Sequence, residues 1–179
     1  MAEAFSNSIT RASGIVTSNA SANIGVTTTI ITGISTVGVA VSNLIINQHF
    51  NGGSKVLSIG SGQVTTDTAS TNSTAATTQS VKFLGVTTAY TSAAATKSVL
   101  IGGTFANNTD NSVKLFVEVF DVSGLTTANL AYDIPVPEGS SFVISDAGKT
   151  LLESEDELRI YADTANSIDT TLSVLTGGN

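Results

Sequence analysis

Alternation of apolar and polar residues is the feature that most restricts how this chain folds. In residues 113–121 (VKLFVEVFD), four aliphatic side chains fall on one face of an extended strand, and Phe116 and Phe120 fall on the other. Because both faces carry apolar side chains, the segment is predicted to be a central strand with one face partly covered by a neighbour. Residues 158–162 and 168–176 alternate in the same way, and no segment has convincing helical spacing of apolar residues. The sequence therefore predicts an all-β chain.

Clusters of turn-forming residues separate the strands at the spacing typical of an antiparallel β-sandwich or barrel. The clearest clusters fall at residues 51–53, 60–62, 107–111, 123–124 and 138–139. A hairpin is predicted between strands at 142–144 and 150–152, with residues 146–149 as its loop. Proline has no backbone N–H to donate, so the run that contains Pro135 and Pro137 is predicted to lie at a sheet edge.

Two stretches of small polar residues, at 65–80 and 91–96, divide the chain. The first is interpreted as an exposed loop or a weak edge strand, and the second as a link into the C-terminal part. We therefore expect an N-terminal arm followed by two β modules, the second an antiparallel, jelly-roll-like β-sandwich. The expected boundaries are 1–23 for the arm, 24–86 for the small β module, 87–96 for the linker, 97–176 for the β-sandwich and 177–179 for the tail.

The residue types that the chain lacks exclude several kinds of site. Among its 179 residues there is no cysteine, so disulfides, cysteine-based zinc sites and thiol nucleophiles are ruled out. His49 is the single histidine, which excludes metal sites with two histidines. We therefore predict that the protein is not an enzyme, and that it has no catalytic residue, no cofactor and no metal site.

The charge of the chain is uneven. The net charge is −7; before residue 100 only Glu3 and Asp67 are acidic, whereas twelve acidic and three basic residues follow it. Nucleic-acid binding needs basic surface, so no nucleic-acid partner is expected. Two interpretations of the asymmetry stay open. The acidic half simply forms a solvated face, or the neutral half is in addition buried against other subunits.

The start of the chain and its longest nearly uncharged stretch bear on targeting. No basic segment followed by an apolar one begins the sequence, so no secretory signal is predicted. Residues 12–48 are nearly uncharged, but serine, threonine, asparagine and glycine interrupt them throughout, which argues against a membrane span. We expect a soluble protein without a membrane partner.

Two local motifs superficially resemble functional ones. His49 precedes a Gly-Gly turn, and a turn histidine with a local hydrogen bond is the favoured interpretation. Residues 52–55 (GGSK) end like a phosphate-binding loop, but they lack the first glycine at the required spacing, reverse the order of lysine and serine, and open no helix. We predict a hairpin turn there and no nucleotide site.

Oxygen-rich segments and tyrosines are the remaining candidates. The acidic run at residues 153–157 lacks the ligand spacing and the central glycine of a calcium loop, so a solvated turn is predicted. Residues 107–111 are also predicted to be a turn. Tyr90, Tyr132 and Tyr161 do not cluster in the sequence, and we assign them to core or interface packing rather than to a sugar-stacking platform.

Two regions of the sequence resemble structural proteins of phages. The first is similar to a small β module of phage structural proteins and comprises residues 32–42 (TGISTVGVAVS) and 53–65 (GSKVLSIGSGQVT). The second is similar to a β-sandwich of phage virion proteins and comprises residues 131–144 (AYDIPVPEGSSFVI), 149–163 (KTLLESEDELRIYAD) and 167–175 (SIDTTLSVL). Where that sandwich has a Gly-Asp turn, this chain has residues 155–157 (EDE).

As a whole, the chain resembles structural proteins of T4-like tailed phages of marine cyanobacteria. The resemblance implies a virion component assembled in the host cytoplasm, and it implies no catalytic residue. We expect a capsid decoration (cement) protein on the outer particle surface. Its expected partners are other virion proteins, such as the major capsid protein, and further copies of itself. A neck or tail protein, with neck or tail proteins as partners, and a carbohydrate-binding adhesive module are the alternatives.

Overall fold

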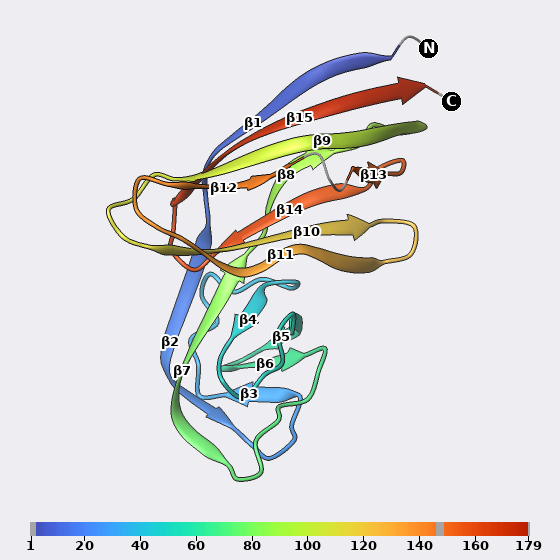
Figure 1. The fold of residues 1–179 in the computed structure, drawn as a ribbon. Coiled ribbons are helices and arrows are strands. Elements are labelled where there is room, and N and C mark those ends of the chain that lie inside the picture. The colour runs from blue at the N-terminus through green and yellow to red at the C-terminus, as the bar shows by residue number, and fades with distance from the viewer. Residues whose placement is uncertain (1–2, 146–148, 179) are drawn as a thin grey trace. The chain divides into compact units, whose positions relative to one another are not determined.

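The computed structural model describes residues 3–145 and 149–178 (Figure 1). All regular secondary structure within these ranges is β-strand. The prediction of an all-β chain is therefore confirmed. The strands form two compact units, one made of the residues up to Gly14 together with those from Thr87 onward, the other of residues 15–86. The chain thus leaves the first unit after Gly14 and returns to it at Thr87.

The first unit is a sandwich of two antiparallel sheets, as predicted. One sheet has the order β1-β15-β9-β12, and β13 also pairs with β9. Its strands are β1 (Ala4–Ser13), β9 (Thr96–Asn107), β12 (Ser141–Ile144), β13 (Thr150–Leu152) and β15 (Ile168–Gly178). The other sheet has the order β11-β10-β14-β8. Its strands are β8 (Thr87–Thr91), β10 (Val113–Asp121), β11 (Thr126–Val136) and β14 (Glu157–Ala162).

Apolar side chains from both sheets meet in one core. Leu172 of the first sheet and Leu115 of the second are both completely buried there. β10 lies between β11 and β14, so residues 113–121 form the central strand that their alternation predicts. The aliphatic face of β10 contributes to the core. Its other face carries Phe116, which packs edge-on against Tyr132 with 5.1 Å between the ring centroids.

The second unit is built on one antiparallel sheet that has its own core. The strand order is β4-β7-β2-β3-β6-β5. The strands are β2 (Ile15–Ile24), β3 (Ile30–Thr32), β4 (Leu44–Ile46), β5 (Val56–Gly60), β6 (Gln63–Thr66) and β7 (Ala76–Gly85). Ile31 and Phe83 are completely buried in the core. The two ends of the sheet come together, because Val56 of β5 donates its N–H to the carbonyl of Asn43, beside β4, at 3.0 Å.

The structure groups the terminal segments differently from the expected order of arm, module, linker and sandwich. Residues 4–13 of the expected arm form β1 and pair with β15, which itself extends to Gly178 in the expected tail. Residues 15–23 of the arm belong to β2, which pairs with β7. Residues 87–91 of the expected linker form β8, which pairs with β14. These pairings join segments far apart in sequence, so local composition carries no sign of them.

Strands β12 and β13 each pair with β9 instead of forming the predicted hairpin. Ile144 lies opposite Gly103, and Thr150 lies opposite Leu100, with both strands antiparallel to β9. The two strands therefore form one interrupted edge beside β9. Residues 146–148 of the predicted loop lie outside the described residues. Turn-forming residues give a hairpin only when the two flanking strands pair with each other. Here both strands pair with β9 instead.

The proline-containing run lies at a sheet edge, as its sequence predicts. Pro135 belongs to β11, the first strand in the order of its sheet, and lies opposite Lys114 of β10. Lys114 also forms an ion pair with Asp133 of β11, with 2.8 Å between its Nζ and Asp133 Oδ1. The missing N–H of a proline is tolerated at such an edge, because one side of the strand has no ladder to satisfy.

A substitution at Gly14, where the chain leaves the first unit, tests the observed path of the backbone at this point. Its φ is +119°, and a Cβ added there would collide with the carbonyl oxygen of Thr164. We expect Gly14→Ala to lower the free energy of unfolding by roughly 2 kcal/mol or more, because the collision adds to backbone strain. Gly53→Ala is the matched control: its φ is +91°, but open space surrounds the added Cβ, so a loss of about 1 kcal/mol is expected. Equal losses in chemical denaturation would contradict the collision.

Candidate functional site

His49 lies in a turn and makes the local hydrogen bonds that the sequence predicts. Its N–H donates to Asn47 Oδ1 at 2.8 Å, and its carbonyl accepts the N–H of Thr71 at 2.7 Å. The imidazole Nε2 lies 3.3 Å from the amide nitrogen of the neighbouring Gln48. The backbone of His49 therefore ties two loops of the second unit together, and its ring lies beside a neutral amide.

Residues 52–55 also form a turn, and it leads into β5. Gly53 adopts a φ of +91°, which glycine accommodates without steric cost. The buried Ser54 donates its hydroxyl to the carbonyl of Asn51 at 2.8 Å. The serine and the glycine of this motif are thus used to close the turn, which confirms the turn prediction.

The acidic run at residues 153–157 is a turn, but one of its carboxylates is buried rather than solvated. Asp156 is only 4% exposed. Its Oδ1 accepts the N–H of Val122 at 3.1 Å, and its Oδ2 accepts the N–H of Glu153 at 2.9 Å. The carboxylate therefore joins the acidic turn to the residue that follows β10. The prediction of a wholly solvated turn is wrong at this residue, because backbone amides replace water around the charge.

The three tyrosines pack separately. Tyr161 is 1% exposed and donates its hydroxyl to Glu118 Oε1 at 3.0 Å. Burial, followed by the negative charge of Glu118, raises the pKa of Tyr161 far above its ordinary value. Tyr90 packs on the sandwich core with its hydroxyl 2.9 Å from Ser98 Oγ, and Tyr132 packs edge-on against a buried phenylalanine. None of the three is exposed, so their assignment to packing is confirmed.

The predicted turn at residues 107–111 is confirmed, and it lines a polar hollow. Asn107 Oδ1 accepts the N–H of Thr109 at 2.9 Å, which is the geometry of an Asx-turn. The hollow has a volume of about 420 Å³, and its lining includes the carboxylates of Asp110 and Glu138. Within the described ranges, no three acidic or histidine side chains gather in a way that would hold a metal ion.

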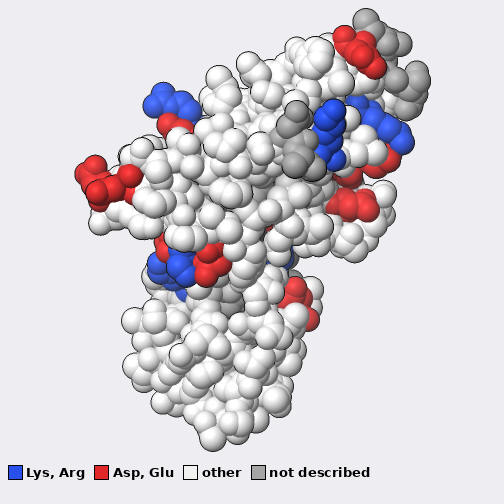
Figure 2. All heavy atoms as spheres, viewed as in Figure 1, with Lys and Arg blue, Asp and Glu red and all other residues white. Residues whose placement is uncertain are grey.

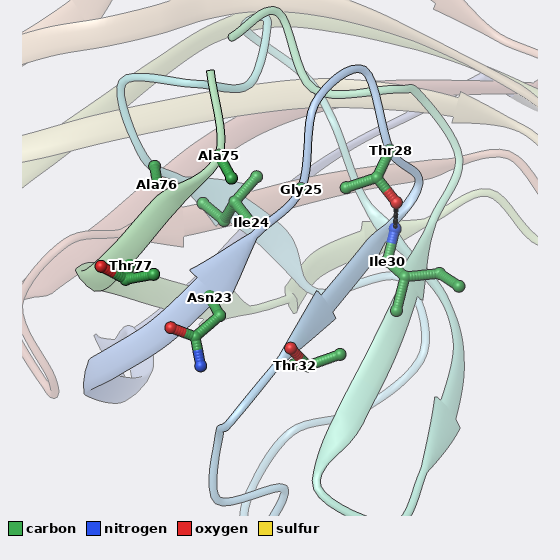
Figure 3. A pocket seen from close by; sticks show the side chains of 9 residues that line it. All are labelled: Asn23, Ile24, Gly25, Thr28, Ile30, Thr32, Ala75, Ala76 and Thr77. Atoms are coloured by element: carbon green, nitrogen blue, oxygen red, sulfur yellow. Dashed lines mark hydrogen bonds between the residues drawn. The ribbon is translucent and has the colours of Figure 1, made fainter. Parts of the chain in front are cut away.

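A second hollow, of about 420 Å³, lies in the other unit and is bordered by β2, β3 and the start of β7 (Figure 3). It is lined by Asn23, Ile24, Gly25, Thr28, Ile30, Thr32, Ala75, Ala76 and Thr77. One of its hydroxyls is already engaged, because Thr28 Oγ1 accepts the N–H of Ile30 at 3.1 Å. These nine residues include no titratable side chain. These residues therefore offer no side chain for proton transfer.

The outward face of the five-stranded sheet in the first unit carries an apolar row. Phe5 lies opposite Leu175, Leu175 opposite Val99, and Val99 opposite Leu151, so the row crosses β1, β15, β9 and β13. Phe5 is 78% exposed and Leu151 is 50% exposed. A second row across the same face consists of Ile9, Thr171, Thr104 and Val143.

The second unit is almost uncharged. Among residues 15–86 only Lys55, Asp67 and Lys82 carry a formal charge, so thirteen of the fourteen acidic residues belong to the first unit. In Figure 2 the part that contains β2 to β7 is almost entirely white. Its surface nevertheless exposes seven large apolar side chains: Ile15, Val26, Ile30, Val37, Val41, Leu57 and Ile59.

Comparison with known protein families, with curated protein sequences and with solved structures found no match to this chain. No helix among the described residues is long and apolar enough to cross a membrane. The exposed apolar side chains of the two units are the candidate functional features of the structure. Sequence reasoning did not locate them, because alternation shows which side chains share a face of a strand but not which face is covered.

Asp156 offers a test of the buried carboxylate. Replacing it by alanine would leave two backbone N–H groups without their acceptor, so we expect Asp156→Ala to lower the free energy of unfolding by roughly 1–3 kcal/mol. The same substitution at the exposed Asp110 is the matched control and should change stability by less than about 0.5 kcal/mol. Denaturant unfolding of both variants measures the difference. A neutral Asp156→Ala would contradict the bonding described for this carboxylate.

Asp121 offers a test of pH dependence in the turn after β10. Its Oδ1 accepts the N–H of Gly124 and the hydroxyl of Ser123, both at 2.8 Å. The Gly124 bond, and then the Ser123 bond, hold the pKa of Asp121 below its ordinary 3.8. Because the folded pKa is depressed, the stabilisation is present above pH 3.8 and is lost as pH falls through the lower folded value.

In an NMR titration, the Gly124 amide shift should therefore move with a midpoint below pH 3.8. The Asp121→Asn variant is the control, since its Gly124 shift should stay flat over the same range. A midpoint at or above the ordinary value would show that the two hydrogen bonds do not form in solution.

Proposed function

We propose that this protein is a structural component of a tailed-phage particle, assembled in the host cytoplasm, which binds the outer capsid surface as a decoration protein. The sequence resemblance within residues 32–65 and 131–175 supports the phage assignment. The exposed apolar surfaces support a structural role. A decoration protein needs a surface that docks on its neighbours and a remainder that stays solvated, and it needs no reactive side chain.

The single observation that carries the proposal is the nearly uncharged surface of the second unit, on which large apolar side chains are exposed. Seven large apolar side chains are exposed on a unit with three charged residues. Removing charge from water is expensive, so a surface with few charges can be buried at low desolvation cost, and its apolar side chains then contribute favourably. We therefore assign the contact with the particle to residues 15–86.

The acidic charge of the first unit fits the solvated part of a decoration protein. Thirteen acidic residues lie in this unit, and Asp110 and Glu138 are exposed beside its polar hollow. Many bound copies would give a particle a negative outer surface, and repulsion between such surfaces keeps particles apart in solution. Symmetry multiplies each weak contact, so a modest affinity of one copy suffices for stable decoration.

Counting copies in purified particles tests the proposal. Quantitative mass spectrometry should find on the order of hundreds of copies per particle, as expected for a protein that follows the symmetry of a capsid surface. About six or twelve copies would instead indicate a ring in the neck or tail, and would overturn the decoration assignment. Absence of the protein from purified particles would overturn the virion assignment itself.

Charge insertion tests which unit makes the contact. Val37 is 83% exposed in the second unit, and Leu125 is 77% exposed in the first. Added to particles that lack the protein, Val37→Asp should bind at least about tenfold more weakly in a sedimentation assay, because a buried unpaired charge opposes docking. Leu125→Asp is the matched control and should bind like the natural protein. Equal binding by both variants would contradict the assignment of the contact to Val37.

A further inference from the structure

β1 is a long open edge of the first unit; β8, at the end of the other sheet, is a shorter edge whose pairing with β14 contains a register shift. β1 pairs with β15 on one side, and in the described residues no strand lies on its other side. Most edges in natural sheets are protected by prolines, bulges or interruptions. β11 carries Pro135 and two register shifts, and the edge opposite β1 is interrupted between β12 and β13. β1, by contrast, keeps regular pairing from Ala4 to Thr10.

The outward face of β1 exposes apolar side chains at a regular spacing. Phe5 is 78% exposed and Ile9 is 69% exposed, and both alternate with the exposed Asn7. Glu3, immediately before the strand, and Arg11, near its end, continue the same alternation and are also exposed. Read from either end, this face therefore presents a charged, an apolar and a polar residue in the same order.

We propose that β1 pairs antiparallel with β1 of a second copy of this chain, about a two-fold axis that passes beside Asn7. In this register Phe5 lies opposite the partner's Ile9, and Glu3 lies opposite the partner's Arg11. Because the pairing is two-fold, each of these contacts occurs twice, and Asn7 faces the partner's Asn7. The interface is isologous: the same patch meets itself.

Charge selects this register over its neighbours. If the side chains are to stay on the same face of the sheet, an alternative register must shift the partner of each residue by two positions. A slip in one direction would place Glu3 opposite the partner's Ile9, and a slip in the other would place Arg11 opposite the partner's Phe5. Both arrangements set a charge against an apolar side chain. Only the proposed register pairs both opposite charges and both apolar side chains.

Among the described residues of its own chain, Arg11 of β1 makes only a long ion pair. Arg11 Nε lies 4.0 Å from Asp169 Oδ2, and the Arg11 side chain is 83% exposed. Its guanidinium therefore keeps donors for a carboxylate across the interface. The strand then ends in a bulge after Thr10, where Ala12 has a φ of +53° and donates its N–H to Asp169. Regular pairing with β15 thus covers Ala4 to Thr10, and the charged residues Glu3 and Arg11 flank it on either side.

The inward face of β1 places no obstacle to this pairing. It carries small side chains, of which Ser8 and Thr10 donate their hydroxyls to the carbonyl of Ala89 within the sandwich. In the proposed register Ser8 lies opposite the partner's Ser6, so neither bulk nor charge collides. On the outward face, the apolar row that reaches Phe5 continues into the partner's Ile9. The two five-stranded sheets thereby become one continuous sheet.

A cysteine at the two-fold axis tests the geometry directly. The chain has no cysteine, so Asn7→Cys introduces a single thiol whose Cα lies directly opposite its symmetry mate, within the range that a disulfide spans. Mild oxidation of the full chain should convert most of Asn7→Cys into a covalent dimer. Ser173→Cys is the matched control: it is exposed on the same face and lies opposite Asn7 within one chain, one strand inward from the edge. It should remain monomeric on denaturing gels. Equal cross-linking of the two variants would overturn the proposal.

Charge reversal tests the register. In light scattering over a concentration series, the natural chain should form a dimer, and Glu3→Arg and Arg11→Glu should each weaken dimerisation at least about fivefold through like-charge repulsion. The double variant restores opposite charges across the interface but not within one chain, so it should regain most of the affinity. A chain that is monomeric at every concentration, a larger oligomer, or a double variant as weak as the singles would overturn the proposal. Circular dichroism checks that each variant folds. The dimer involves β1 alone, so its presence or absence is independent of binding to a particle.

Discussion

The antiparallel pairing of β1 with β15 is the contact on which the rest of the architecture depends. It brings the first and last strands of the chain into one sheet, in an unbroken register from Ala4 opposite Thr176 to Thr10 opposite Thr170. Because the described residues before 15 and after 86 both belong to the sandwich, residues 15–86 are inserted between two parts of its sequence. Their own long pair, with Ile15 opposite Gly85, brings the exit and the return of the chain together. The second unit can thus vary its surface without breaking the sandwich.

Whether each sheet edge is closed, interrupted or open links this fold to the functions proposed for it. The second unit closes its edges, since hydrogen bonds such as that from Val56 to Asn43 join the two ends of its sheet. One edge of the sandwich carries Pro135, and another is interrupted between β12 and β13. β1 remains open and presents Phe5 and Ile9. An all-β chain must pair, cover or interrupt every edge, so an open and apolar edge is where a second copy is expected.

Polar side chains in this protein serve mainly to close turns. Asp156, Asp121 and Asn107 each accept backbone N–H groups at the end of a strand. Carboxylates and amides placed in this way are as polar as those of an active site, but their acceptors are already satisfied by the backbone. A sequence shows which residues can accept hydrogen bonds, but not which of them already accept one from a backbone N–H group. For that reason the acidic run at 153–157 indicated solvent exposure, although Asp156 is buried.

The sequence by itself determined the all-β class, the central position of β10 and the edge position of Pro135, because alternation and the missing proline N–H act through local geometry. It also excluded every site that needs cysteine. Only the tertiary structure decided that residues 4–13 join β15, that β12 and β13 share β9, and that Phe5 lies in line with Leu151. Strand partners are chosen by long-range packing, and a strand of given alternation fits several partners equally well. The exposed surfaces follow from those choices, and so they became visible only once the sheets were assembled.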